Sequence, residues 1–272
     1  MSRIDKAARF KALHDSPHAW VIANPWDGAS ARILAASGFK ALTTSSGAAA
    51  ATRGQRDGQL SRDAVLEHCR AIVEATDLPV AADLEHGFGD TPAEVAQTLC
   101  LAADAGLVGG SIEDSTGRAE APLFDIGEAS DRIAAAVEAA RGTAGGFVLT
   151  ARAENYLHGR PDLEDTIRRL QAYERAGADV LFAPGLPDLN AVRTVCASVS
   201  KPVNFMIGMK GRSFPVAELD AAGVRRISLA ASLYRAAMTG LLAAVREIQE
   251  SGTFGYVERS LATPELVKFL KP

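Results

Sequence analysis

Long hydrophobic runs, blocks of basic residues and paired cysteines are all scarce in this sequence of 272 residues. A membrane-spanning helix needs about 20 consecutive apolar residues, and because no run is that long we expect no membrane association. The net charge of -4 and the lack of a Lys/Arg-rich block argue against nucleic acid as a partner. The N-terminus has the pattern of a charged amphipathic helix without the apolar centre of a secretion signal, so a cytoplasmic protein is expected.

The cysteines are too few and too far apart for a disulfide or zinc framework. Cys69, Cys100 and Cys196 are odd in number and lie within apolar helical patterns. This pattern is typical of buried free thiols, and we expect all three to be buried. A catalytic cysteine is the less favoured interpretation.

Short apolar segments alternate with helical segments along the chain. Gly38, Gly106, Gly177 and Gly223 each lie just before such a segment, where a left-handed glycine can close a helix. Strands joined by crossover helices pair in parallel, and eight βα units favour a closed barrel. Helices are expected over 29–37 and 61–75, and strands over 20–24, 41–46, 80–83, 108–113, 147–152, 180–183, 203–207 and 226–230.

The fold class predicted from this alternation is α/β, with a (β/α)8 TIM-type barrel. Residues 1–272 would form one barrel domain, with an N-terminal helix over 1–17 and a C-terminal helical extension over 253–272. A length of 272 residues lies close to the roughly 250 that is typical of such barrels. A doubly wound open sheet stays open as an alternative, because the sequence does not show closure.

Two carboxylates and two glycines follow the third strand directly. Asp83 and Glu85 should point to the same side, because alternate residues of a strand share a face. Like charges held that close favour either a bound divalent cation or a protonated acid. An isolated pair of this kind could equally be a solvated strand end.

Further polar residues end the neighbouring strands, and barrel active sites lie at that edge. Asp57 follows the second strand, Glu113 ends the fourth, Arg152 ends the fifth and Asn204 lies in the seventh. Carboxylates converging there would form an oxygen-only site, which suits Mg²⁺, with Mn²⁺ as the alternative. Trp26, near a strand end, could wall the pocket or belong to the core.

The same residues resemble the isocitrate lyase/phosphoenolpyruvate mutase superfamily over nearly the whole chain. The resemblance rests on the segments 24–32, 45–47, 83–89, 112–114, 150–154 and 173–179, in matching order and spacing. It implies that Asp83 contacts Mg²⁺ directly and that Asp57, Glu85 and Glu113 hold waters of the ion. It also implies that Arg152 faces the substrate. The family pattern has Asp where this chain has Glu85, and the role of His86 is left open.

A substrate grip is implied by the resemblance as well. Ser46 and the backbone amides of Gly47 and Ala48 would hold a substrate carboxylate, next to Ser45 at the same strand end. Arg152, Glu113 and Asp57 are therefore the predicted catalytic residues. Ser45, Ser46, Gly47, Ala48, Trp26, Arg152 and Asn204 are the predicted substrate-binding residues, and Asp57, Asp83, Glu85 and Glu113 the predicted metal residues.

The resemblance also implies that the loop after the fourth strand determines which reaction a member of this superfamily catalyses. It implies a Lys-Lys-Cys-Gly-His type motif there in isocitrate and methylisocitrate lyases and an Asn with basic neighbours in the mutases. Segment 113–124 contains no Cys, Asn or Lys. We therefore predict carbon–carbon cleavage or decarboxylation of a small 2-oxo or 2-hydroxy (di)carboxylate through an enolate. Phosphorus–carbon chemistry is the second hypothesis, and a non-catalytic 2-oxo acid binding protein is the third.

The apolar residues of the C-terminal extension need a partner surface. The resemblance implies that the last helix is exchanged between neighbouring barrels. A homo-oligomer, dimer or tetramer, is therefore expected.

Overall fold

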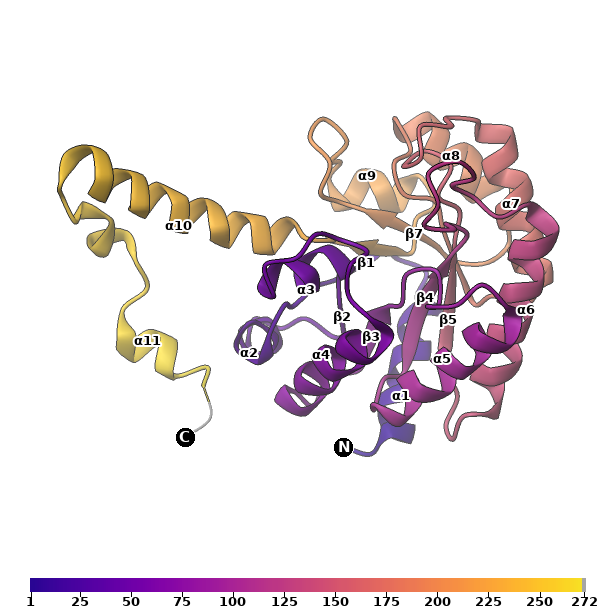
Figure 1. Cartoon of the computed structure of the whole chain (residues 1–272), viewed down its shortest axis with the longest axis horizontal. Coiled ribbons are helices and arrows are strands. Elements are labelled where there is room, and N and C mark those ends of the chain that lie inside the picture. Colours follow the sequence, from indigo (N-terminus) through magenta and orange to yellow (C-terminus); the bar gives the residue numbers. More distant parts are fainter. Residues whose placement is uncertain (271–272) are drawn as a thin grey trace.

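The computed structural model describes residues 1–270, and within them eight parallel strands form one sheet wrapped by helices (Figure 1). The strand order is β1-β8-β7-β6-β5-β4-β3-β2. A parallel bridge between Ala23 and Leu42 joins the first strand to the second and closes the sheet. The barrel prediction is confirmed, and the open-sheet alternative is wrong.

The strands agree with the predicted positions. They are β1 (Trp20–Ile22), β2 (Leu42–Thr43), β3 (Val80–Asp83), β4 (Gly109–Glu113), β5 (Val148–Arg152), β6 (Val180–Phe182), β7 (Val203–Met206) and β8 (Arg226–Ser228). Strand β3 has the predicted bounds, β4 and β5 begin one residue later than predicted, and the other strands end earlier than predicted. The second strand stops early because Ser45 caps a short helix by accepting a hydrogen bond from the Ala48 amide. The sequence did not indicate this helix.

Several helices of the barrel begin at polar capping residues. Asp27, Ser61 and Thr91 each accept a hydrogen bond from the backbone of the first turn that follows. The helices are α1 (Arg3–His14), α2 (Gly28–Ala36), α3 (Ser46–Thr52), α4 (Arg62–Ala75), α5 (Pro92–Asp104), α6 (Ile126–Gly142), α7 (Leu163–Arg175), α8 (Leu189–Ala197), α9 (Val216–Ala221), α10 (Ser232–Ser251) and α11 (Thr263–Val267), with a 3₁₀ turn η1 (Gly255–Arg259).

One part of the chain leaves the barrel. Helix α10 projects from the barrel, and η1 and α11 continue this arm to the C-terminal end (Figure 1). The predicted extension over 253–272 falls in this arm, except that residues 271 and 272 lie outside the described residues. No helix within residues 1–270 is both long and apolar enough to cross a membrane.

The cysteine prediction holds only in part. Cys69 is buried, whereas Cys196 is half-buried and Cys100 is exposed. Cys100 is exposed because Leu99 and Ala102 on either side of it occupy the face of α5 that packs on the barrel. The expectation of three buried thiols is therefore wrong for Cys100.

Candidate active site

A cavity of about 230 Å³ lies inside the barrel, toward the carboxyl ends of the strands. Its volume is below the roughly 300–1,000 Å³ of pockets that hold drug-sized ligands, so it suits a small molecule. Its lining contains seven of the predicted site residues: Ser45, Ser46, Gly47, Asp57, Asp83, Arg152 and Asn204.

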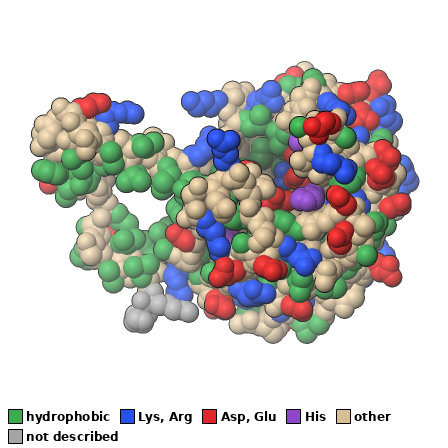
Figure 2. Space-filling view, viewed as in Figure 1, with side chains coloured by type: hydrophobic (Ala, Val, Ile, Leu, Met, Phe, Trp, Pro, Cys, Tyr) green, Lys and Arg blue, Asp and Glu red, His purple; other side chains and the backbone are tan. Residues whose placement is uncertain are grey.

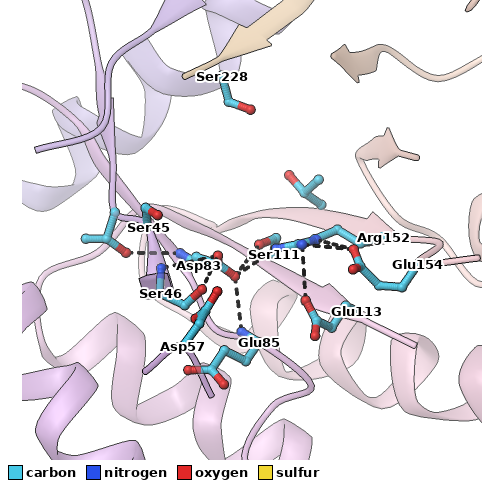
Figure 3. A network of polar contacts seen from close by, with 12 residues as sticks. Ser45, Ser46, Asp57, Asp83, Glu85, Ser111, Glu113, Arg152, Glu154 and Ser228 are labelled. Atoms are coloured by element: carbon cyan, nitrogen blue, oxygen red, sulfur yellow. Dashed lines mark hydrogen bonds and ion pairs between the residues drawn. The ribbon is translucent and has the colours of Figure 1, made fainter. Parts of the chain in front are cut away.

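Asp83 is the centre of a polar network at this cavity (Figure 3). Its Oδ1 accepts a hydrogen bond from Arg152 Nη1 at 2.9 Å, and its Oδ2 accepts one from the Ser46 hydroxyl at 3.0 Å. Asp57 approaches from the loop after α3: a Cβ on Gly47 would lie 3.1 Å from Asp57 Oδ2. A glycine at position 47 therefore leaves space for this carboxylate.

Glu85 joins the cluster by a different route from the predicted one. Strand β3 ends at Asp83, and Glu85 has φ 49, in the left-handed region, so strand alternation does not aim its side chain. The Glu85 amide donates to Asp83 Oδ1 at 3.3 Å, and the side chain lies beside Asp57 (Figure 3). Burial, together with the charges of Asp83 and Asp57, raises the pKa of Glu85 to about 8.

Arg152 lies among three carboxylates on the opposite side of Asp83. It contacts Asp83 Oδ1 at 2.9 Å, Glu113 Oε2 at 3.3 Å and Glu154 Oε1 at 2.8 Å. Burial alone would lower the pKa of Arg152, but these carboxylates hold it well above its usual value. Burial raises the pKa of Glu113, although Arg152 opposes this effect. The guanidinium is thus fixed and permanently charged.

The acidic cluster fits a hydrated divalent cation. Asp57, Asp83 and Glu85 lie close together (Figure 3), and the charges of Asp83 and Asp57 add to burial in raising the pKa of Glu85. Within residues 1–270 no three His, Cys, Asp or Glu side chains are spaced to bind an ion directly. Mg²⁺ commonly keeps several waters and takes only one or two carboxylates, so wider spacing still suits it.

The predicted substrate grip lies at the start of α3. Ser45, Ser46 and Gly47 line the cavity, while Ala48 is buried behind them. The amide of Ala48 donates to Ser45 Oγ at 3.4 Å, so in this structure that amide caps the helix.

Trp26 lies outside the cavity lining, contrary to its predicted place in the pocket wall. Its ring packs against Tyr234 at the start of α10, with ring centroids 5.7 Å apart. The chain turns away from the cavity here, because the Trp26 amide donates a hydrogen bond to Ser30 Oγ at 3.0 Å and Asp27 caps α2. His86 also lies away from the cavity lining.

Comparison with known proteins decides the family. The family model described as phosphoenolpyruvate phosphomutase matches residues 10–249. The chain belongs to the isocitrate lyase/phosphoenolpyruvate mutase superfamily. A candidate lyase/mutase from Burkholderia cenocepacia J2315 has a crystal structure with 48% identity and a TM-score of 0.97, covering 98% of this chain and 96% of that one.

Two curated relatives have names that describe carbon–carbon bond cleavage. The 2-methylisocitrate lyase of Escherichia coli K12 is 33% identical over 73% of this chain and 69% of its own length. Oxaloacetate decarboxylase 2 of Pseudomonas putida W619 is 30% identical over 76% of this chain and 67% of its own length. Superfamily membership and these relatives support an enzyme.

Segment 114–124, the loop after β4, is closed on itself. Ser115 bridges to Leu123, and the Thr116 amide donates to the Pro122 carbonyl at 3.0 Å. None of the cavity-lining residues comes from segment 114–124. In this structure the loop therefore supplies no side chain to the cavity.

Sequence reasoning missed several residues at this cavity. Glu154 pairs with Arg152, and Thr150, Arg226 and Ser228 line the cavity. One signal was available: charged Arg226 opens an otherwise apolar strand, where a buried charge is rare. Its alternation with Ser228 shows that both side chains point inward.

Proposed function

We propose that this protein is a Mg²⁺-dependent lyase or decarboxylase, with Mn²⁺ as a substitute ion. Its substrate would be a small 2-oxo or 2-hydroxy (di)carboxylate, cleaved at a carbon–carbon bond through a pyruvate-type enolate. The observation that carries this proposal is that Asp57, Asp83 and Arg152 line one small cavity, with the Glu85 carboxylate beside Asp57.

The bound ion would supply Lewis-acid stabilisation of negative charge on the substrate oxygens. Asp83 would hold it, and Asp57, Glu85 and Glu113 would hold its waters. The Arg152 guanidinium, fixed by Glu113 and Glu154, donates toward the oxygen on which charge develops. Because the guanidinium is positioned before the reaction begins, it stabilises the transition state without reorganisation.

The start of α3 would orient the other end of the reacting group. Ser46 lies 3.0 Å from Asp83, so a carboxylate bound at Ser45, Ser46 and Gly47 would lie next to the metal residues. If the Ser46 hydroxyl donated its hydrogen bond to the substrate in place of Asp83, Asp83 Oδ2 would be free to bind the ion.

Carbon–carbon cleavage is favoured because the closed loop after β4 brings neither a cysteine nor an asparagine to the cavity. The relatives named 2-methylisocitrate lyase and oxaloacetate decarboxylase support the same choice. Phosphoenolpyruvate mutase or phosphonopyruvate hydrolase chemistry is the second candidate, supported by the family model.

A substrate panel tests the proposal. The protein is incubated with Mg²⁺ and oxaloacetate, 2-methylisocitrate or phosphonopyruvate, and pyruvate is measured with the second product, which is CO₂, succinate or phosphate. We expect pyruvate from a carbon–carbon substrate, complete loss with EDTA and recovery with Mg²⁺ or Mn²⁺. Turnover that survives EDTA contradicts the metal assignment. Raised melting temperatures without any product indicate a non-catalytic binding protein.

We also propose that the arm packs on a second copy of the chain. All residues of α10 have exposed or half-buried side chains, and Leu241, Leu242 and Val245 are exposed. Figure 2 shows hydrophobic side chains along the arm. An apolar surface of this kind is expected to be covered in solution, which favours a homo-oligomer.

A further inference from the structure

Arg226 is a buried arginine at the deep end of the cavity. It is the first residue of β8, whereas Ser228, two residues nearer the mouth, also lines the cavity. Only 7% of Arg226 is exposed, and its guanidinium faces the same space as Thr150 and Asn204.

The contacts of Arg226 are all with uncharged groups. Its Nε donates to Asn204 Oδ1 at 2.8 Å, its Nη2 donates to Thr150 Oγ1 at 2.9 Å, and its Nη1 lies 3.2 Å from His14 Nε2. His14 is neutral at this position, because burial and then Arg226 lower its pKa to about 3. In the described part of the chain no Asp or Glu forms an ion pair with Arg226.

Two other buried arginines of the barrel, Arg152 and Arg169, are paired with acids, whereas buried Arg132 donates to the backbone carbonyls of His86 and Asp90. Arg152 contacts three carboxylates, and Arg169 contacts Asp114 at 3.0 Å and Asp165 at 2.8 Å. A buried charge without a partner is costly, so such a group is retained where an anion binds it during function. Arg226 therefore differs from Arg152 and Arg169 in having only uncharged partners, and from Arg132 in lining the cavity.

The guanidinium also has unused donors. An arginine has five N–H groups, and the three contacts of Arg226 leave one N–H on each terminal nitrogen. Two such groups can bind one carboxylate in a bidentate arrangement. The cavity is thus acidic around Asp83 near the mouth and cationic at Arg226 in its depth.

We propose that Arg226 binds the distal carboxylate of the substrate and thereby selects dicarboxylates over monocarboxylates. The assignment rests on the proposed function for the orientation of the substrate, whose reacting end lies at Asp83 and Arg152. A substrate with one carboxylate would leave Arg226 without an anion.

Binding measurements with simple acids test this assignment. Isothermal titration calorimetry in the presence of Mg²⁺ compares succinate and malate, which carry two carboxylates, with pyruvate, which carries one. R226M is expected to weaken succinate and malate binding by about 10- to 100-fold, the usual effect of losing hydrogen bonds to a charged group. Pyruvate affinity is expected to change less than about 2-fold, because pyruvate has no distal carboxylate.

The adjacent Arg225 provides a matched control. It lies outside the cavity lining, with Nη1 3.8 Å from Asp220 Oδ1, so R225M removes the same charge without touching the cavity. All three affinities should stay unchanged in R225M. If R226M does not fold, as judged by its melting curve, R226Q and R226K carry the test. R226Q should behave as R226M, and R226K should keep part of the dicarboxylate affinity.

Two results overturn the assignment. Equal losses of pyruvate and succinate affinity in R226M and R226Q would show that Arg226 has a purely structural role. A wild-type protein that binds neither succinate nor malate would also contradict the assignment. Failure of the lyase proposal is recognised separately, as absence of Mg²⁺-dependent turnover in the substrate panel. Succinate binding that depends on Arg226 would persist in that case.

Discussion

Replacement of Arg152 by methionine tests the central charge arrangement of the site. The substitution removes every ion pair that Arg152 makes with Asp83, Glu113 and Glu154, and these carboxylates then lie together in a buried space. Breaking a buried pair typically costs about 3–5 kcal/mol of folding free energy. At roughly 2–4 °C per kcal/mol for a chain of this size class, R152M should melt about 6–20 °C lower than the wild type.

The effect on turnover should be large as well. Loss of one preorganised donor typically lowers kcat by about 10²- to 10³-fold. The assay is steady-state pyruvate release by R152M at a temperature where its melting curve shows a folded protein. A fall in kcat, measured at saturating substrate, separates this effect from weaker binding.

R169M is the matched control for R152M. Arg169 is also buried between two carboxylates, Asp114 and Asp165, but it lies outside the cavity lining. R169M should lose comparable stability and retain kcat within a few-fold. Near wild-type kcat in R152M, or equal losses of kcat in both variants, would refute the catalytic role of Arg152.

Three other substitutions test separate parts of the structure. D83N should remain folded and lose Mg²⁺-dependent turnover, measured by pyruvate release with and without EDTA. Lowering the pH from 7.5 to 5 should destabilise the wild type by about 2 kcal/mol through His14, because its pKa of about 3 in the fold lies below the unfolded value near 6.5. H14Q should lack this contribution in urea unfolding. L242D should reduce self-association in sedimentation velocity, because Leu242 is exposed on the arm.

Each of these substitutions has a control at an exposed residue. D63N alters an exposed acid of α4 and should keep full turnover. H18Q alters an exposed histidine and should keep the pH effect on stability. Q249D adds a charge to an exposed polar position of α10 and is the control for the self-association of L242D. Metal-dependent turnover in D83N would contradict its role as the ion ligand. A pH slope in H14Q equal to that of the wild type would exclude His14 as its source, and an unchanged oligomer in L242D would exclude this face of α10 as the contact.

The sequence predicted the barrel because the physical rules for parallel strands are local. Apolar segments of strand length, separated by helices that end at residues such as Gly106 and Gly177, can pair in only a few ways. The same rules placed Asp83, Glu113 and Arg152 together, since the carboxyl ends of parallel strands meet at one edge of the barrel.

Details that depend on turns could not be predicted in this way. Strand alternation predicted that Glu85 lies near Asp83, and it does. The reason is different, because a left-handed turn places the Glu85 side chain. Trp26 was expected near the pocket, but the cap of α2 directs the chain outward to Tyr234. The backbone conformation of single residues and the capping of helices decide such positions.

The sequence alone therefore determined the architecture, the superfamily resemblance and the edge of the barrel at which the acids gather. Only the tertiary structure decided which charges are paired. Arg152 and Arg226 are both arginines of apolar strands, yet one lies among three carboxylates and the other among neutral groups. The partners of an inward side chain come from strands across the barrel, far away in sequence, so local patterns carry no information about them.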